Sequence, residues 1–123
     1  MMNLSDARQI ACGWINAFND HDLDRVMDFY ADDLVFTSPL IVTRMGVDSG
    51  TITSKSELRR YFATALGPDS VLIFDLQDVF VGVSSITLLY QNHRNELVAE
   101  TKILNAEGKA ERVYVHHLAA PLT

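Results

Sequence analysis

Two adjacent histidines near the end of the chain, His116 and His117, are the first side chains whose type suggests chemistry. Imidazole binds metal ions and exchanges protons near neutral pH. The pair lies in a stretch with the composition of a strand, where neighbouring residues point to opposite faces, so the two rings cannot readily bind one ion. No His, Cys or carboxylate stands at a supporting zinc spacing. We expect no metal site and no cofactor, with one histidine in solvent and one at a pocket mouth.

The other reactive side chains fit structural roles better than chemical ones. Asp32-Asp33 is typical of a helix end, and no third carboxylate accompanies it to bind a cation. Cys12 follows Ala11 in a helical pattern and has no neighbour in sequence that would lower its pKa, which predicts an inert thiol. His21 and His93 fall in predicted connections, where we expect them to be exposed. No glycine-rich phosphate loop or nucleotide motif is present.

Composition and charge narrow the possible partners. The 123 residues are 48% hydrophobic, as expected for one domain over residues 1–123. Ten Lys and Arg against 16 Asp and Glu give a net charge of −6, which disfavours nucleic acid and anionic membranes. A single cysteine forms no internal disulfide, and neither a signal-peptide pattern nor an apolar run of membrane-spanning length is present. We therefore expect a cytoplasmic protein with no membrane association.

The first half of the chain has the periodicity of helices. One apolar stripe predicts a helix that begins near Ser5. Asp22 can cap a second helix, with Tyr30 on its apolar face. Ser54 and Glu57 form a capping box that predicts the start of a third helix.

The period changes from about 3.6 to 2 near Val71. A short strand at residues 34–37 is expected to end at Ser38-Pro39. The later strands are predicted at 71–83, 84–92, 97–104 and 110–118. Helices followed by consecutive antiparallel strands predict an α+β fold, in which three helices cover one face of a curved, mostly antiparallel sheet.

Six groups of residues occur in a characteristic order and spacing. They are Trp14-x-x-Ala17-Phe18-Asn19, Asp22-Leu23-Asp24, Phe29-Tyr30-Ala31-Asp32-Asp33, Phe36-x-Ser38-Pro39, Gly50 before Leu58-Arg59-x-Tyr61-Phe62, and Gly108-Lys109. In these residues the chain resembles the nuclear transport factor 2-like superfamily, and within it the SnoaL-like and ketosteroid-isomerase-like branch. The resemblance implies a single SnoaL-like domain shaped as a cone-like roll, with the sheet wrapped around the helices. It also implies an apolar pocket open at one end, and a homodimer joined through the sheet.

The resemblance also assigns positions to the catalytic groups of the isomerase-like proteins. Their carboxylate base corresponds to Ser38, their tyrosine donor to Trp14, and a supporting hydroxyl to Phe62. Only the oxyanion acid keeps a carboxyl group, at Glu100. Because a serine without an activating partner is no base, we do not expect steroid-type isomerisation.

The orientation of Glu100 depends on the register of the last hairpin. A four-residue loop at 105–108 places Glu100 on one face with Val113 and Val115, whereas a three-residue loop places it on one face with Tyr114. The hydrophobic pattern favours the shorter loop, and the resemblance favours the longer one. If the two valines point inward, His117 points inward as well.

These observations predict a binder of a small hydrophobic or aromatic molecule, with weak acid–base chemistry of the isomerase, cyclase or hydrolase type. In an apolar cone, desolvation would raise the pKa of Glu100, so that a neutral acid donates to a ligand carbonyl, while His117 acts as an acid or base. The alternative is a non-catalytic dimeric interaction domain whose pocket is filled. The predicted ligand-contacting residues are Trp14, Phe18, Tyr30, Phe36, Ser38, Met45, Phe62, Ile86, Leu88, Tyr90, Val113 and Val115.

Overall fold

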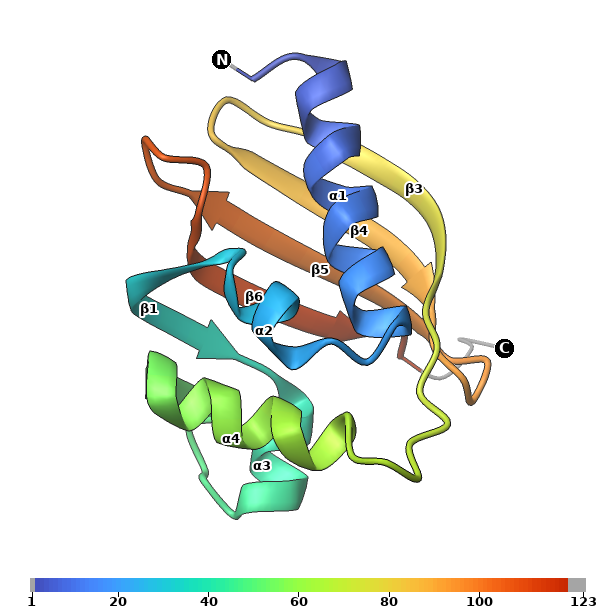
Figure 1. Cartoon of the computed structure of the whole chain (residues 1–123). Helices are drawn as coiled ribbons and strands as arrows, with labels where there is room; N and C mark the ends of the chain where they lie inside the picture. The colour runs from blue at the N-terminus through green and yellow to red at the C-terminus, as the bar shows by residue number, and fades with distance from the viewer. Residues whose placement is uncertain (1, 120–123) are drawn as a thin grey trace.

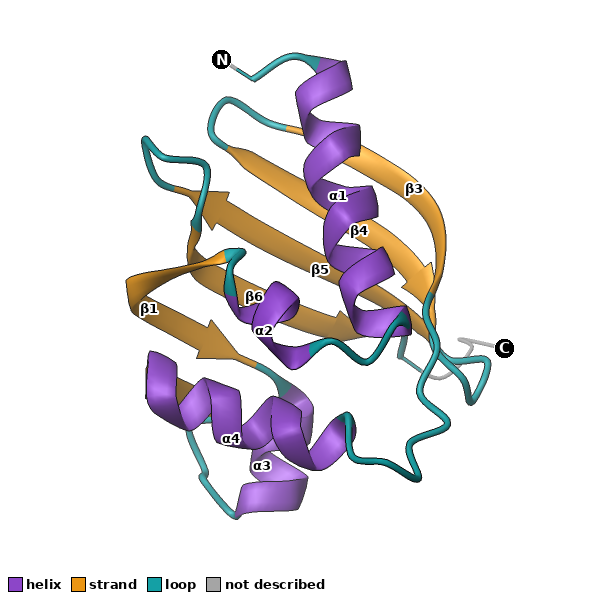
Figure 2. Cartoon of the chain, viewed as in Figure 1, coloured by secondary structure: helices purple, strands orange, loops and turns teal. Residues whose placement is uncertain are grey.

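In the computed structural model, which describes residues 2–119, the helices lie within residues 4–65. The helices are α1 (Leu4–Asn19), α2 (Leu23–Met27), α3 (Pro39–Met45) and α4 (Lys55–Ala65). The strands are β1 (Tyr30–Thr37), β2 (Thr51–Ser54), β3 (Asp75–Val81), β4 (Ser85–Gln91), β5 (Leu97–Leu104) and β6 (Ala110–His117). The predicted α+β class is confirmed, and Figure 2 shows the two kinds of element in separate layers.

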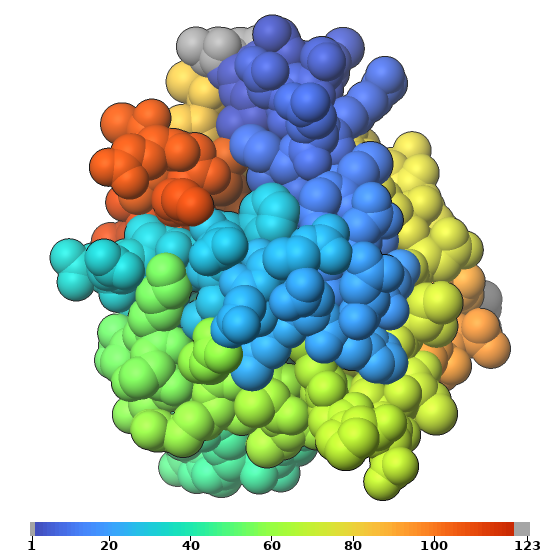
Figure 3. Space-filling view, in the orientation of Figure 1, coloured from blue at the N-terminus to red at the C-terminus, as the bar shows by residue number. Residues whose placement is uncertain are grey.

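All the strands form one curved, open sheet with the order β2-β1-β6-β5-β4-β3. Only β1 and β6 run parallel, and every other neighbouring pair is antiparallel. The sheet curves around α1, which crosses it obliquely, while α2 and α4 cover the part nearest β1 (Figure 1). The space-filling view shows these helices closing the face that is turned to the viewer (Figure 3).

Side-chain caps set the starts of the helices. Asn3 caps α1 by accepting a hydrogen bond from the backbone of Asp6, two residues before the predicted Ser5. Asp22 caps α2 and Ser54 caps α4, as the sequence predicts. The interior of the sheet carries the regular alternation of buried residues that a period of two requires.

Two predictions for the middle of the chain are wrong. Tyr30 and Asp32-Asp33 belong to β1 rather than to the end of the second helix, which ends at Met27. The strand predicted at 71–83 begins only at Asp75.

The predicted end of the first strand is confirmed, since β1 stops at Thr37; Ser38 then caps the additional helix α3, and Pro39 occupies its first turn. Proline is favoured there because its missing N–H is unpaired at that position in any case.

The β5–β6 hairpin combines features of both predicted registers. The backbone N–H of Asn105 donates to Lys109 over 2.8 Å, so the loop is the shorter one. Glu111 is then an extra residue on β6, a β-bulge between two pairs of the ladder. The bulge restores the face expected from the longer loop, and Glu100 stands opposite Val115.

Segment 66–74 connects α4 to β3 and is tied to the end of α1. The side chain of Asn19 donates to the carbonyl of Phe74 and accepts from its backbone N–H, at 2.9 and 2.7 Å. One ring nitrogen of His21 lies 2.8 Å from the carbonyl oxygen of Leu72. His21 is therefore half-buried rather than exposed, and Phe74 is fixed beside the open end of the sheet.

No helix among residues 2–119 is both long and apolar enough to cross a membrane.

Candidate functional site

A cavity of about 90 Å³ opens between the end of α1, the end of α4 and the β4–β5 turn. Its walls are mainly apolar and aromatic, and its polar groups gather at two places. We call the buried group of Trp14, Tyr90 and Glu100 the inner end, and the exposed group of Arg44, Arg94 and Glu96 with His93 and His117 the mouth. The remaining lining residues are Phe18, Phe36, Ser38, Leu40, Tyr61, Phe62, Ala65, Leu72, Phe74, Asn92, Val98 and Val115.

The aromatic wall is built from helices and sheet together. Phe18 of α1 packs edge-on against Phe62 of α4, with ring centroids 5.1 Å apart. Phe74 packs on Tyr90 at 4.5 Å and stacks on Trp14 at 5.8 Å. The segment that Asn19 fixes in place therefore completes the wall, and the inner end is lined by rings on several sides.

Glu100 lies at the inner end and is only 2% exposed. The hydroxyl of Tyr90 donates to one carboxylate oxygen, Oε1, over 2.9 Å. Nζ of Lys102 donates to the other, Oε2, over 2.6 Å. A buried ion pair of this kind is expensive to desolvate, so good geometry and further hydrogen bonds are needed to retain it.

Lys102 is itself fully buried, at 1% exposure, behind the cavity wall. Its Nζ lies 3.7 Å from the centroid of the Trp14 ring and 5.1 Å from that of Tyr30, positions that favour cation–π attraction. The Tyr30 hydroxyl oxygen accepts from Lys102 at 3.4 Å and from Nε1 of Trp14 at 3.0 Å. The Trp14 N–H is therefore already bonded inside the protein.

Burial and the Glu100 charge shift the titration of this network. Burial raises the pKa of both Tyr30 and Tyr90 well above the ordinary value, and the negative charge of Glu100 raises both further. Burial lowers the pKa of Lys102, while Glu100 opposes that shift. The two tyrosines thus stay protonated and act as hydrogen-bond donors or acceptors, not as bases, at neutral pH.

The ion pair changes the role expected for Glu100. The sequence analysis expected a neutral acid that donates a hydrogen bond to a ligand carbonyl. With an ammonium group and a phenol both donating to it, Glu100 is instead a carboxylate, and its free lone pairs accept. A group facing it from the cavity should therefore be a hydrogen-bond donor.

Sequence reasoning missed Lys102, although a usable signal was present. Val98, Glu100, Lys102 and Leu104 alternate along β5, and all four are buried. A strand that turns Glu100 inward must turn Lys102 inward too. The inward orientation of Lys102 was not predicted, because a lysine side chain is almost never fully buried unless it is paired.

A further polar group borders the cavity where β1 meets α3. Ser38 is 3% exposed, and its hydroxyl oxygen accepts from the backbone of Leu40 as the cap of α3. Gly50 is required beside it, because a Cβ there would lie 3.1 Å from the Ser38 carbonyl oxygen and the φ of Gly50 is +65°. Burial raises the pKa of Tyr61, opposed by Arg44 and by hydrogen bonding with Ser38. Among residues 2–119, no histidine or carboxylate that could act as its base is hydrogen-bonded to the Ser38 hydroxyl.

His116 and His117 point to opposite sides of the sheet. His116 is exposed, whereas His117 lines the cavity. His93 was expected to be exposed, but it is half-buried and also lines the cavity. Glu100 and His117 share the cavity but not a hydrogen bond, since the partners of Glu100 are Lys102 and Tyr90.

The predicted ligand-contacting residues divide into three groups. Met45 is 44% exposed at the end of α3, so its expected inward orientation is wrong. Four residues are buried in the core and do not line the cavity: Tyr30, Ile86, Leu88 and Val113. The other seven line it: Trp14, Phe18, Phe36, Ser38, Phe62, Tyr90 and Val115.

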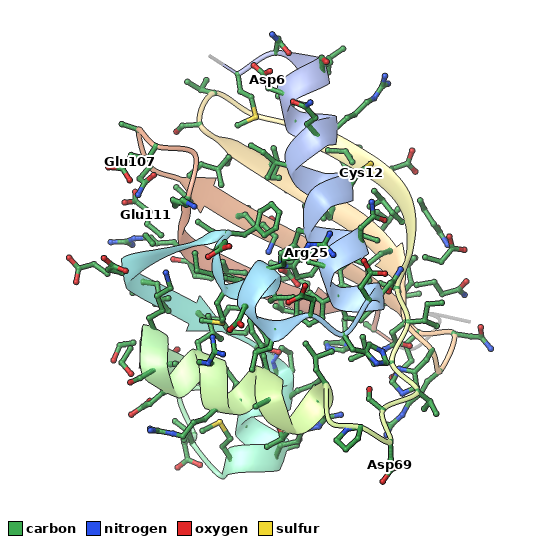
Figure 4. The ribbon with its side chains drawn as sticks, viewed as in Figure 1. Asp6, Cys12, Arg25, Asp69, Glu107 and Glu111 are labelled. Atoms are coloured by element: carbon green, nitrogen blue, oxygen red, sulfur yellow. The ribbon has the colours of Figure 1, made fainter. Side chains whose placement is uncertain are left out.

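The described residues form no candidate metal centre, and the lone thiol does not line the cavity. Within residues 2–119, no three or more His, Cys, Asp or Glu side chains come together in a way that could hold a metal ion. Cys12 is exposed on α1, away from the cavity (Figure 4).

The open cone of sheet and helices is the fold of nuclear transport factor 2-like proteins. The sequence profile of the SnoaL-like domain matches residues 12–119 of this chain. The chain therefore belongs to the SnoaL-like domain family, as the resemblance in sequence implied. The search of curated proteins found no match.

Solved structures agree with this assignment. A SnoaL-like protein of unknown function from Burkholderia thailandensis is 29% identical, with a TM-score of 0.90 over 95% of this chain and 98% of that one. SalBIII, an epoxide hydrolase/cyclase-like enzyme with a role in pyran ring formation in the polyether salinomycin, is 15% identical, with a TM-score of 0.73 over 95% and 94%. An NTF2-like protein of unknown function from Cytophaga hutchinsonii is 12% identical, with a TM-score of 0.73 over 95% and 94%. The last two show the shared fold alone.

Proposed function

We propose that this protein binds a small, largely apolar ring molecule that carries a hydroxyl group, and that Glu100 performs acid–base chemistry on it. The reaction class is that of an isomerase, cyclase or hydrolase. The observation that carries the proposal is the position of Glu100. This carboxylate lines an apolar cavity and accepts hydrogen bonds from Tyr90 and Lys102, which fix its orientation. Ionisable groups placed in this way concentrate at functional sites.

The volume of the cavity sets the size of the molecule. About 90 Å³ is less than the 150 Å³ or so of an engineered cavity that holds benzene. The cavity is open at the mouth, so one six-membered ring can enter with its substituents extending outward. The argument against steroid chemistry is independent of size, because the isomerase-like base position is occupied by Ser38.

The chemistry follows from the charges of the inner end. A ligand hydroxyl that donates to Glu100 transfers its proton to the carboxylate as its oxygen attacks an electrophilic carbon of the same ligand that bears an oxygen leaving group. The bond from that carbon to the leaving oxygen breaks with its electron pair on the oxygen, which takes up a proton. The Lys102 ammonium stays paired with the carboxyl group, and the Tyr90 hydroxyl keeps its orientation fixed. His117, on the same cavity, is the second group that can supply or take a proton.

A matched pair of probes tests occupancy of the cavity. We expect 4-ethylphenol to raise the melting temperature and to bind more tightly than ethylbenzene, which lacks the hydroxyl. Ala65→Phe should abolish binding of both probes, because Ala65 lines the cavity. Ala63→Phe is the control, since it adds the same ring to the exposed side of α4. Binding that survives Ala65→Phe would place the probe elsewhere and defeat the proposal.

Variants of Glu100 test the contact with the hydroxyl. Glu100→Ala should reduce the affinity for 4-ethylphenol by about 1–3 kcal/mol and leave that for ethylbenzene nearly unchanged. The ratio of the two affinities is the readout, because a general loss of folding affects both probes. Glu107→Gln, at the exposed hairpin on the far side of the molecule (Figure 4), should leave the ratio unchanged.

A homodimer through the outer face of the sheet remains a prediction, as does a cytoplasmic location. Leu89, Ile103 and Tyr114 are only half-buried on that face, and Phe80 is 57% exposed there. Covering them would remove apolar surface from water. Light scattering should report twice the monomer mass at micromolar concentration, and a monomer would contradict the prediction.

The alternative function is a non-catalytic dimeric domain whose pocket is filled by its own side chains. The open cavity of about 90 Å³ favours ligand binding over this alternative.

A further inference from the structure

The mouth of the cavity collects cationic and imidazole side chains from separate elements. Arg44 comes from α3, His93 and Arg94 from the turn between β4 and β5, and His117 from the end of β6. All four line the same cavity. Segments far apart in the sequence therefore contribute to one rim of the cavity.

These groups are not neutralised by the protein around them. Within residues 2–119, neither Arg44 nor Arg94 forms a salt bridge, whereas Arg25, Lys55, Arg59 and Lys102 each do. Nδ1 of His93 and Nε2 of His117 are buried and have no hydrogen-bond partner among the described residues. Buried polar atoms are nearly always bonded, so these two ring nitrogens are available to bond with a molecule that enters the cavity.

The acidic residues of the lining do not cancel this positive charge. Glu100 is already paired with Lys102 at the inner end. Glu96 lies at the mouth and accepts from the side chain of Asn92 over 3.1 Å. Two arginines against one free carboxylate leave the mouth positive in a protein whose net charge is −6.

We propose that the ligand is a monocyclic carboxylate, with its ring in the cavity, its hydroxyl at Glu100 and its carboxylate at the mouth. This inference rests on the proposed function and adds the anionic group to it. The planar guanidinium groups of Arg44 and Arg94 suit a carboxylate, to which arginine donates paired hydrogen bonds. The N–H groups of His93 and His117 can complete the coordination of its oxygens.

The test compares 4-hydroxybenzoate with methyl 4-hydroxybenzoate, which keeps the ring and hydroxyl but carries no charge. We expect the acid to bind the wild type at least tenfold more tightly than the ester in calorimetric titration at low salt. Raising the salt concentration should weaken binding of the acid and leave that of the ester unchanged, because screening acts on the charge alone.

Arginine variants assign the effect to the mouth. Arg44→Gln and Arg94→Gln should each weaken binding of the acid by about fivefold and leave that of the ester unchanged. Arg8→Gln is the control, since it removes the same charge from an exposed position on α1 that does not line the cavity.

The outcomes separate this inference from the proposed function. An ester that binds as tightly as the acid, with both lost in Ala65→Phe, overturns the carboxylate and leaves the ring site standing. Failure of both probes and of 4-ethylphenol to bind overturns the proposed function and this inference with it. An acid whose affinity is unaffected by Arg44→Gln and Arg94→Gln together also overturns the inference.

Discussion

The charged side chains at the two ends of the cavity differ in burial and in pairing. At the inner end, Glu100 and Lys102 are both almost fully buried, and hydrogen bonds join them to each other, to Tyr90 and Tyr30, and through Tyr30 to Trp14. At the mouth, Arg44 and Arg94 are exposed and have no ion pair among residues 2–119.

Glu100 at the inner end is fixed by bonds within the protein, whereas Arg44 and Arg94 at the mouth are available to bind a ligand. The inner end is preorganised, because the positions of its acceptor oxygens are fixed before a ligand arrives. At the mouth, the exposed side chains of Arg44 and Arg94 have no ion-pair partner among the described residues, so ordering them on binding costs conformational entropy. We therefore expect substitutions at the inner end to change stability strongly, and substitutions at the mouth to change ligand affinity alone.

The largest effect is expected from breaking the buried ion pair. Lys102→Met should lower the free energy of unfolding by about 3–5 kcal/mol at neutral pH, because Glu100 is left charged and buried without its cation. Urea unfolding of this variant and of the wild type measures the loss.

The double variant Glu100→Gln with Lys102→Met is the matched control for that loss. It should be more stable than Lys102→Met alone, since the unpaired charge is gone. A double variant that loses the sum of the two single effects would show that the pair contributes no coupling energy.

A smaller effect is expected from Tyr90. Tyr90→Phe should lower the free energy of unfolding by about 1–3 kcal/mol at neutral pH, because Oε1 of Glu100 loses its donor. Urea unfolding of the variant and the wild type measures this loss.

Tyr90 also affects the stability of the protein at high pH. Its pKa is raised in the folded state, so above about pH 10 the folded protein binds more protons than the unfolded chain and the free energy of unfolding falls as pH rises.

Comparing the two proteins across that range isolates this contribution. The fall should be shallower in Tyr90→Phe than in the wild type by about 1.4 kcal/mol per pH unit. The lowered pKa of Lys102 has the opposite sign below about pH 10.5, and because Lys102 is present in both proteins it largely cancels. Parallel curves would mean that Tyr90 titrates as it does in the unfolded chain.

The smallest effect on stability is expected at the mouth. Arg94→Gln should change the free energy of unfolding by no more than about 0.5 kcal/mol, because the side chain is exposed and has no ion pair among the described residues. A loss of 2 kcal/mol or so in thermal or urea unfolding would remove the contrast between the two ends.

Much of this architecture follows from local patterns in the sequence. The change of period near Val71 predicts the strands, and side-chain caps at Asp22 and Ser54 predict two of the helix starts. Helix α3 could not be recognised in this way, because Ser38-Pro39 is as typical of a strand end as of a helix start. The choice depends on the tertiary context, in which the Ser38 N–H is bonded to the carbonyl of Gly50.

The sequence predicted the aromatic lining of the cavity better than the positions of its charged side chains. Phe18, Phe62 and Tyr90 were expected in the pocket from their type and period, and they line it. The Glu111 bulge, which no loop-length rule specified, decides that Glu100 shares a face with Val115. Lys102 lies two residues further along β5 and was not considered for the site. Arg44 belongs to α3, the helix that was missed, so its place at the mouth was not predictable from the sequence.

The central claim is that a buried Glu100–Lys102 ion pair forms the inner end of a ligand-binding cavity. Nitrogen-15 NMR of the lysine side chains tests it directly, since the chain has only the three lysines Lys55, Lys102 and Lys109. We predict one ammonium signal at neutral pH that exchanges slowly with water, disappears in Lys102→Met and shifts when 4-ethylphenol is added. A Lys102 signal that exchanges as fast as the other two, or that is unmoved at saturating 4-ethylphenol, would contradict the account.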